Sequence, residues 1–400
     1  MRWPSISRRG LFRGIGAAAA AGAAISVLPG CTNPEQEEVP EPMVVDTERA
    51  INALEEYLEK DLDFVEHETW SLPLGSVLHE ASGTWIPVTQ AGSSATLMVK
   101  GCALSMADGT LVDVVPDVRG NKSSVVIYDT RCSDEVYAWV ELDYLTHEWV
   151  LYATKFSNGA AEGTATTLWK GDANYDPPGF ACYDKMVLWQ IMPSLSGSKT
   201  SERSYCYLWK LGSENAKSVV ESPGRFAIAP SISGDVVVLA PRVRADEGVF
   251  YGVTAYSLDD DLATTVDQLV LPQTVKPFYA THIGDRFAIS IEASYSSGGL
   301  FGNMGTYVGT SNGPFVRLAR EPSANVAGKN DTFIIKSRTS YFVLDVKKST
   351  YSILTAANRS LDYGEYPVRV GSSSDFVTFA TVKDEASGYP SSVTVRSFGV

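Results

Sequence analysis

A turn aspartate followed by a short apolar strand recurs along most of this chain. The copies begin at Asp134, Asp184, Asp235, Asp285, Asp331 and Asp375, so successive copies lie 44 to 51 residues apart. A period of about 40–50 residues is typical of repeats that each form a four-stranded propeller blade. Asp residues hydrogen-bond the backbone of tight turns, so we expect these six to be structural rather than catalytic.

The repeat predicts an all-β fold, a seven-bladed β-propeller with six clear blades and a degenerate first blade at residues 84–124. One short helix is expected to precede it. The chain ends after the third strand of the last blade, so residues 76–81 are expected to supply its outer strand and remove an open sheet edge. The alternative is two stacked β-sandwich domains, which would not produce a steady period.

The first 31 residues form a charged segment followed by an apolar one. Arg2, Arg8, Arg9 and Arg13 occur without any acidic residue, and residues 14–28 are mostly Ala and Gly. That pattern predicts a signal peptide. The apolar run is too short for a membrane span, which needs about 20 apolar residues.

Two motifs carry a family resemblance. The sequence SRRGLFR at residues 7–13 resembles the twin-arginine export motif, with Arg8 and Arg9 as its paired arginines. The sequence LPGC at residues 28–31 resembles the lipobox of bacterial lipoproteins, although Pro29 is an unusual occupant. The resemblance implies export and a lipid anchor at Cys31 on the outer face of the bacterial cell membrane. The alternatives are a cytoplasmic helix and, for Cys31, a plain thiol.

Four segments follow from these patterns. Residues 1–30 are the expected signal peptide, and residues 31–45 are a Pro- and Glu-rich spacer expected to be disordered. Residues 46–74 are the expected helical segment, because Ile51, Leu54, Leu58 and Leu62 recur at helical spacing. Residues 75–400 are the expected propeller.

The charge of the chain argues against several partners. The formal net charge is −14, and it becomes more negative once the four arginines of residues 1–30 are removed. Nucleic acid and anionic lipid both require a cationic surface, so neither is an expected partner. We expect a monomer.

Catalytic and metal motifs are absent from the sequence. Its four histidines do not occur at metal-ligand spacing, and there is neither a nucleophile elbow nor a phosphate loop. Besides Cys31 there are four cysteines, with no CxxC pair to indicate zinc. They are buried thiols or form one or two bridges, and three pairings are open. We therefore expect no cofactor, no metal and no catalytic residue. The four cysteines are Cys102, Cys132, Cys182 and Cys206.

Long loops predict a binding face. The segments 192–204, 241–251, 294–305 and 383–391 are expected to gather at one face, and they carry aromatic and Arg residues of the kind that dominate interfaces. The alternative is ordinary loops whose aromatics fold back onto the protein. The candidate residues are Arg203, Arg242, Arg244, Phe250, Tyr251, Tyr295, Phe301 and Tyr389.

The repeated Asp-strand pattern, with aromatic outer strands, resembles bacterial propellers of the TolB and YncE types. That resemblance implies the fold and an extracytoplasmic binding role. We therefore expect a non-catalytic binding or scaffold lipoprotein that engages a protein, a peptide or a glycan. The alternative is an extracytoplasmic hydrolase or lyase acting on glycans or peptides, which would need two carboxylates converging in the central channel.

Overall fold

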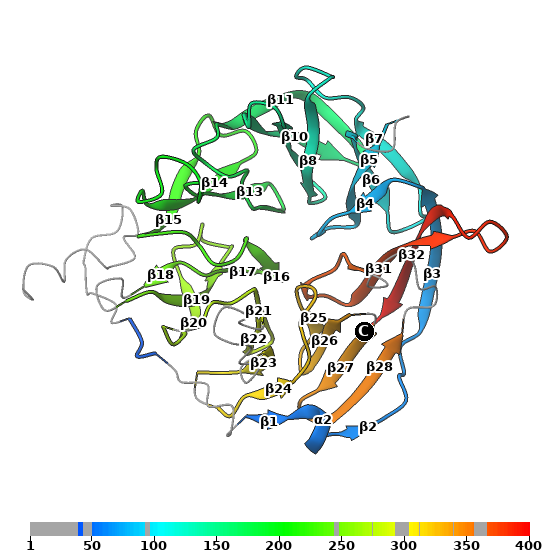
Figure 1. Cartoon of the computed structure of the whole chain (residues 1–400), viewed down its shortest axis with the longest axis vertical. Coiled ribbons are helices and arrows are strands. Elements are labelled where there is room, and N and C mark those ends of the chain that lie inside the picture. The colour runs from blue at the N-terminus through cyan, green and yellow to red at the C-terminus, as the bar shows by residue number, and fades with distance from the viewer. Residues whose placement is uncertain are drawn as a thin grey trace, which may run out of the picture.

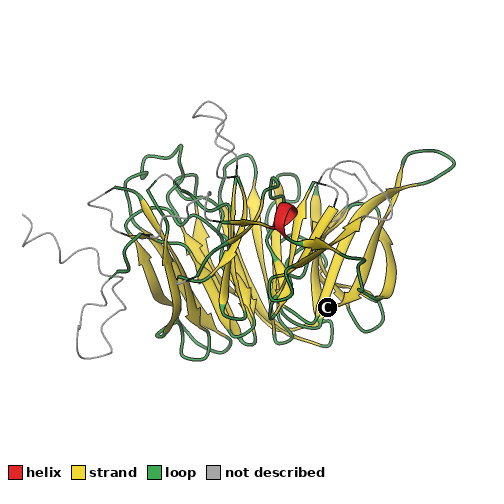
Figure 2. Cartoon of the chain, turned by 90° about the horizontal axis from the view of Figure 1, so that it is seen from below, coloured by secondary structure: helices red, strands yellow, loops and turns green. Residues whose placement is uncertain are grey.

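The computed structural model describes residues 39–42, 50–92, 97–243, 248–273, 275–292, 304–311, 313–338, 340–355 and 366–400. Within these ranges the strands form seven sheets, which stand side by side in a closed ring (Figure 1). Seen from the side, the ring is a disc with strands running between its two faces and loops gathered on both faces (Figure 2). The fold is an all-β propeller.

Six of the described sheets are blades built from consecutive strands, and the first strand of each blade lies nearest the axis of the ring (Figure 1). The first blade has β4 (Ser76–Leu78), β5 (Trp85–Ala91), β6 (Met98–Ser105) and β7 (Leu111–Val115). The second has β8 (Val125–Cys132), β9 (Val136–Asp143), β10 (Trp149–Ser157) and β11 (Ala160–Gly171). The third has β12 (Phe180–Tyr183), β13 (Met186–Ile191), β14 (Ser204–Lys210) and β15 (Lys217–Ser222).

The next three blades follow the same plan. The fourth has β16 (Ser231–Ser233), β17 (Val236–Leu239), β18 (Arg242–Val243), β19 (Phe250–Ser257) and β20 (Thr265–Val270). The fifth has β21 (Tyr279–Ile283), β22 (Arg286–Ile291), β23 (Gly305–Gly309) and β24 (Val316–Leu318). The sixth has β25 (Ala327–Lys329), β26 (Thr332–Ser337), β27 (Ser340–Asp345) and β28 (Thr350–Thr355).

The remaining sheet is a composite of both ends of the described chain. It contains β29 (Tyr366–Pro367), β31 (Asp375–Lys383), β32 (Pro390–Gly399) and, as its outer strand, β3 (Glu66–Pro73). Strand β3 pairs antiparallel with β32 over its whole length. This pairing joins the last sheet to the N-terminal side of the chain, so the ring closes without leaving β32 as an open edge.

The residues before β3 run around the rim of the ring. Strand β1 (Ile51–Asn52) pairs in parallel with β24 of the fifth blade, and β2 (Leu58–Glu59) pairs in parallel with β28 of the sixth. Between them lies α2 (Ala53–Glu56), which begins where the Asn52 side chain accepts a hydrogen bond from the Leu54 amide. The N-terminal segment thus covers the outer edges of two blades (Figure 1).

The fold predicted from the sequence is wrong in three respects. The prediction of seven blades is wrong, because the described sheets comprise six blades of consecutive strands and one composite sheet. The blade predicted to be degenerate, β4–β7, is one of the six. The outer strand that closes the ring is β3, not residues 76–81, because β4 is the inner strand of the first blade. The predicted helix is reduced to the four residues of α2, because pairing with β24 and β28 holds its flanks in an extended conformation.

Two of the repeated aspartates, Asp235 and Asp285, lie in the tight turns that the sequence predicts, whereas Asp375 is the first residue of β31. Asp235 and Asp285 are each the second residue of a two-residue hairpin turn between the first two strands of a blade. The residues before them, Gly234 and Gly284, have φ angles of 62° and 63°. Glycine adopts this left-handed conformation without steric strain, so the Gly-Asp pair fits the tight turn.

A cluster of buried apolar side chains lies between neighbouring sheets. Between the second and third blades, for example, Trp149 packs in one cluster with Val187 and Trp189. Between the composite sheet and the first blade, Leu72 of β3 is in one cluster with Ile86. Burying each such side chain contributes about 1.5–3 kcal/mol, so these interfaces stabilise the ring.

No helix within the described ranges has the length and apolarity needed to span a membrane.

All four described cysteines are buried free thiols. Of the two interpretations that the sequence left open, buried thiols or disulfide bridges, the structure therefore agrees with buried thiols. Burial and a hydrogen bond to Asp113 raise the pKa of Cys102 to about 12. Such a thiol is poorly reactive near neutral pH.

Ring closure gives a first prediction. A chain starting at residue 75 lacks β3, whereas one starting at residue 50 keeps it, so we expect only the shorter chain to self-associate and to unfold at a clearly lower temperature. Within the full chain, Leu72→Ala should lower the free energy of unfolding by about 2–5 kcal/mol, because Leu72 is buried between two sheets. Calorimetry and size-exclusion chromatography measure both effects. Equal melting temperatures for the two truncated chains would contradict the role of β3.

Candidate functional site

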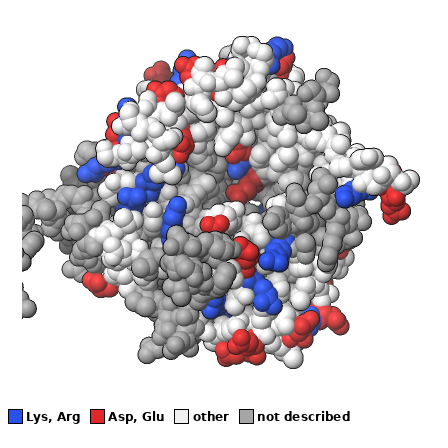
Figure 3. All heavy atoms as spheres, in the orientation of Figure 1, with Lys and Arg blue, Asp and Glu red and all other residues white. Residues whose placement is uncertain are grey.

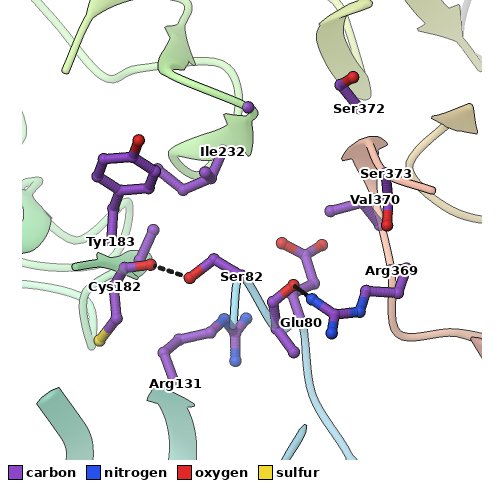
Figure 4. A pocket seen from close by; sticks show the side chains of 13 residues that line it. Glu80, Ser82, Arg131, Cys182, Tyr183, Ile232, Arg369, Val370, Ser372 and Ser373 are labelled. Atoms are coloured by element: carbon purple, nitrogen blue, oxygen red, sulfur yellow. Dashed lines mark hydrogen bonds between the residues drawn. The ribbon is translucent and has the colours of Figure 1, made fainter. Parts of the chain in front are cut away.

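A polar cavity of about 120 Å³ lies at the centre of the ring. Its lining comes from the first four blades and from the composite sheet, and it includes Glu80, Ser82, Arg131, Tyr183 and Arg369. Seen down the axis, acidic and basic atoms lie together in the central hollow (Figure 3). We call this site the central cavity (Figure 4).

Two extended segments, residues 79–83 and 368–373, meet at the central cavity. The Ala81 amide donates to the Val368 carbonyl at 3.1 Å. The Ser82 hydroxyl reaches past the second blade and donates to the Cys182 carbonyl at 2.6 Å (Figure 4). These bonds connect the first blade to the composite sheet and to the third blade, so the cavity walls are fixed by the backbone.

Gly371 lets the second segment cross the ring. It belongs to β30 (Gly371–Ser372), which pairs in parallel with β25 of the sixth blade. Its φ is 68°, and a Cβ atom there would lie 2.4 Å from the Ile232 carbonyl oxygen of the fourth blade. Only glycine fits such a close backbone approach at a positive φ. The segment therefore contacts both the fourth and the sixth blade.

Asp129 is the centre of a buried charge cluster beside the cavity. His79 Nδ1 lies 2.9 Å from Asp129 Oδ1, and the same oxygen accepts a hydrogen bond from Arg131 Nη1. The Thr130 amide donates to it at 2.8 Å. Burial alone would raise the pKa of Asp129, but Arg131 and His79 outweigh burial and lower it to about 2. Asp129 is therefore a fixed negative charge that holds Arg131 in place.

Glu80 has the opposite electrostatic environment. Burial raises the pKa of its carboxyl group and the charge of Asp129 raises it further, whereas Arg131 and His79 lower it without overcoming burial. Two neighbouring carboxylates thus have pKa values shifted in opposite directions. Groups whose pKa values are strongly perturbed gather at functional sites, which marks the cavity as a candidate site.

Arg369 forms the far wall of the cavity. It is only 8% exposed, and its Nη1 and Nη2 groups donate to the carbonyls of Ala81 and Gly83. Its Nε is buried without a hydrogen-bond partner among the described residues. Burial lowers the pKa of this guanidinium, and Asp375 offsets the effect only in part.

A second concavity lies at the periphery of the ring, between β11 of the second blade and β14 of the third. Its volume is about 430 Å³, and we call it the aromatic groove. Four half-buried aromatic side chains line it together with charged residues of both signs. The lining includes Trp169, Lys170, Tyr175, Glu202, Arg203, Tyr205 and Tyr207.

The aromatic groove is held in shape by ring contacts and hydrogen bonds. The rings of Trp169 and Tyr207 have centroids 4.7 Å apart. The Tyr175 hydroxyl donates to Glu202 Oε2 at 2.7 Å and accepts from Lys199 Nζ at 2.9 Å. The groove is therefore preformed, with its aromatic side chains already ordered.

The predicted binding residues that the structure describes lie on separate hairpins around the ring. Arg203 lines the aromatic groove and pairs with Glu221. Arg242, Phe250 and Tyr251 lie at the β18–β19 hairpin of the fourth blade, and Tyr251 is buried.

Tyr389 is 74% exposed, and it lies in the β31–β32 loop, on the opposite side of the ring from β18 (Figure 1). Arg8, Arg9, Cys31, Arg244, Tyr295 and Phe301 lie outside the described residues.

The sequence reasoning missed Glu80, Asp129, Arg131 and Arg369, as well as Trp169. The one available signal was the alternation DTR at residues 129–131, which places two opposite charges inside an otherwise apolar strand. The other residues come from different sheets, so only the closed ring brings them together. The described residues contain no group of three or more side chains suited to hold a metal ion.

No family model and no curated protein matches this chain. Solved structures similar to it include one from a study of two prolyl endopeptidases, at a TM-score of 0.51 and 13% identity; the match covers 81% of this chain. It covers 50% of that chain, so the present chain spans half its length. This likeness supports the propeller fold.

Two further solved structures are similar at lower scores. The β-propeller domain of the Trilobed protease from Pyrococcus furiosus gives a TM-score of 0.49 at 9% identity, over 76% of this chain and 91% of that one. Citrobacter koseri AztD gives 0.45 at 10% identity, over 81% and 90% of the two chains.

The charge cluster gives a second prediction. Asp129→Asn leaves Arg131 in the cluster without its charged partner. It should lower the free energy of unfolding by about 3–5 kcal/mol at pH 7. Because the pKa of Asp129 is about 2 in the folded chain and its ordinary value is 3.8, its stabilising effect is present above about pH 4. It is lost as the pH falls from about 4 to about 2. Urea unfolding across this range measures the loss.

The exposed ion pair of Asp117 and Lys122 supplies the control. Asp117→Asn should change stability little, because exposed pairs contribute little. If Asp129→Asn lowers the free energy of unfolding at pH 7 no more than Asp117→Asn does, Asp129 does not stabilise the fold through Arg131.

Proposed function

We propose that this chain is a membrane-anchored, extracytoplasmic β-propeller lipoprotein. Its proposed role is non-catalytic: it binds or scaffolds a partner, and the groove favours a peptide or a glycan over a folded protein. The observation that carries the proposal is the aromatic groove, a preformed concavity lined by four aromatic side chains and by charges of both signs. The resemblance to propellers of the TolB and YncE types is consistent with such a role.

The groove has the physical properties of a ligand site. Its volume of about 430 Å³ falls within the range of about 300–1,000 Å³ typical of ligand pockets. Tyr and Trp offer large apolar faces at a low cost in side-chain entropy. Lys170 and Arg203 at the edge can pair with acidic groups of a bound chain. A concave site of this kind suits an extended chain better than a flat protein surface.

The proposed anchor leaves this groove accessible. Export depends on Arg8 and Arg9, and two acyl chains on Cys31 would make membrane attachment stable. The described chain enters the ring at β1, on the fifth blade, whereas the groove lies between the second and third blades, across the ring (Figure 1). The tether and the ligand would therefore occupy different parts of the rim.

An extracytoplasmic hydrolase or lyase acting on glycans or peptides is the second candidate. It is favoured by Glu80 and Asp129, whose pKa values are shifted in opposite directions near one cavity. Against it, the Asp129 carboxylate is occupied by His79 and Arg131. The binding role is therefore the better supported of the two.

Ligand binding to the groove is our third prediction. Peptide and glycan arrays probed with the purified chain should yield binders. For these binders, Trp169→Ala and Tyr205→Ala should each weaken affinity about tenfold or more, because aromatic anchors dominate such interfaces. Affinity is measured by titration calorimetry, with melting temperatures to check folding. Cleavage of a bound oligomer by the chain would favour the enzyme instead.

Tyr389→Ala is the matched control, since Tyr389 is an exposed tyrosine far from the groove. It should leave affinity unchanged. If Tyr389→Ala weakens binding and Trp169→Ala does not, the ligand binds at the loop face that the sequence predicted.

Localisation gives a fourth prediction. Replacing Arg8 and Arg9 by Lys should leave the precursor in the cytoplasm, and Cys31→Ala should release the exported chain from the membrane. Cell fractionation and immunoblotting measure both. Unimpaired export of the first variant would overturn the twin-arginine assignment, and continued membrane attachment of the second would overturn the lipid anchor.

A further inference from the structure

The central cavity is separate from the aromatic groove and has a different character. A dry cavity of about 150 Å³ accommodates benzene, so about 120 Å³ suits a molecule of roughly five or six non-hydrogen atoms. Its walls combine charged and hydroxyl side chains with a small apolar side formed by Ala181, Ile232 and Val370. A small polar ligand fits this lining.

The Glu80 carboxylate is the acceptor in this cavity. It points into the space between Tyr183, Ile232 and Ser372 (Figure 4). Its neighbours Arg131, Asp129 and His79 act on it electrostatically, and none of the described residues donates a hydrogen bond to it. Glu80 is half-buried, so its carboxylate stays accessible from the cavity and can accept a hydrogen bond from a bound molecule.

The donors lie on the arginines that line the same cavity. Arg131 uses Nη1 for Asp129 and for the Thr130 carbonyl, so its Nη2 makes no hydrogen bond within the described ranges. Arg369 is more than nine-tenths buried, and its Nε is unpartnered.

The charges of the cavity balance. Glu80 and Asp129 supply two negative charges, and Arg131 and Arg369 supply two positive charges. Both Nη groups of Arg369 are bound to carbonyls, whereas Arg131 uses only Nη1, so Arg131 is the guanidinium that can meet a ligand. The site is therefore neutral overall and strongly dipolar. A bare cation would meet two guanidinium groups, and a bare anion would meet Glu80, so either would be poorly matched. A zwitterion, which carries one positive and one negative charge, can pair with the carboxylate and with a guanidinium group at the same time.

We propose that the central cavity binds a small zwitterion of the α-amino acid class, with its ammonium group on Glu80 and its carboxylate facing Arg131. The size of the cavity restricts the ligand to a small side chain, such as that of glycine, alanine or serine. Ser372 lines the same space, and its hydroxyl offers a further hydrogen bond. The Ser373 hydroxyl is already bonded to the Asp375 backbone. The ligand would bridge the first two blades and the segment 368–373.

Titration calorimetry on the full chain at pH 7.5 tests this proposal with five probes: glycine, L-alanine, L-serine, methylammonium and acetate. At least one amino acid should bind ten times or more tighter than methylammonium and acetate, each of which carries one of the two charges. Glu80→Gln should weaken amino acid binding at least tenfold. Glu148→Gln, which alters an exposed acid in the β9–β10 turn, is the matched control and should leave it unchanged.

Melting temperatures keep the result interpretable. Because burial disfavours the ionised form of Glu80, Glu80→Gln should melt at or above the temperature of the unmodified chain, so its loss of binding would not reflect unfolding. The proposal is overturned if no amino acid binds, if methylammonium or acetate binds as tightly, or if Glu80→Gln binds as well as Glu148→Gln. These outcomes are independent of the groove, because Trp169→Ala should leave amino acid binding intact.

Discussion

The packing of each sheet between two neighbours is the constraint on which this structure depends. Clusters of buried apolar side chains lie between sheets, so a sheet at the end of an open row would expose one apolar face. The row must therefore close on itself. Closure is achieved by β3, which pairs with β32 and adds Leu72 to the last interface. The chain ends are joined by hydrogen bonds as well as by apolar contact.

Closure of the ring forms the central cavity, where charged side chains from several sheets lie close together. The inner strands converge there, and the segments 79–83 and 368–373 fill the space between them. The segment 368–373 approaches β16 of the fourth blade so closely that Gly371 is required at the contact with Ile232. Charged side chains from several sheets then share one small, poorly hydrated volume, which lowers the pKa of Asp129 and raises that of Glu80. The aromatic groove, by contrast, depends on only two neighbouring blades.

Parts of the fold were predictable because they depend on local patterns. The tight turns before β17 and β22 form because Gly and Asp adopt the turn conformation locally. The period of the six repeated aspartates revealed the propeller. The helix expected within residues 46–74 was predicted wrongly, because the spacing of its apolar residues is also compatible with short edge strands. Pairing with β24 and β28 holds residues 51–52 and 58–59 as strands. Of the candidate binding residues, Arg203 alone lines a described concavity. A loop's length does not reveal where its side chains lie.

The sequence by itself determined the repeat, the all-β class and the tight turns at Asp235 and Asp285, since successive antiparallel strands and their turns join residues close in the chain. Tertiary structure alone decided which strand closes the ring, because β3 and β32 are separated by most of the chain. It also decided that Glu80, Arg131 and Arg369 share one cavity. These side chains come from different sheets, and their pKa values and pairing depend on distances that exist only once every interface has formed.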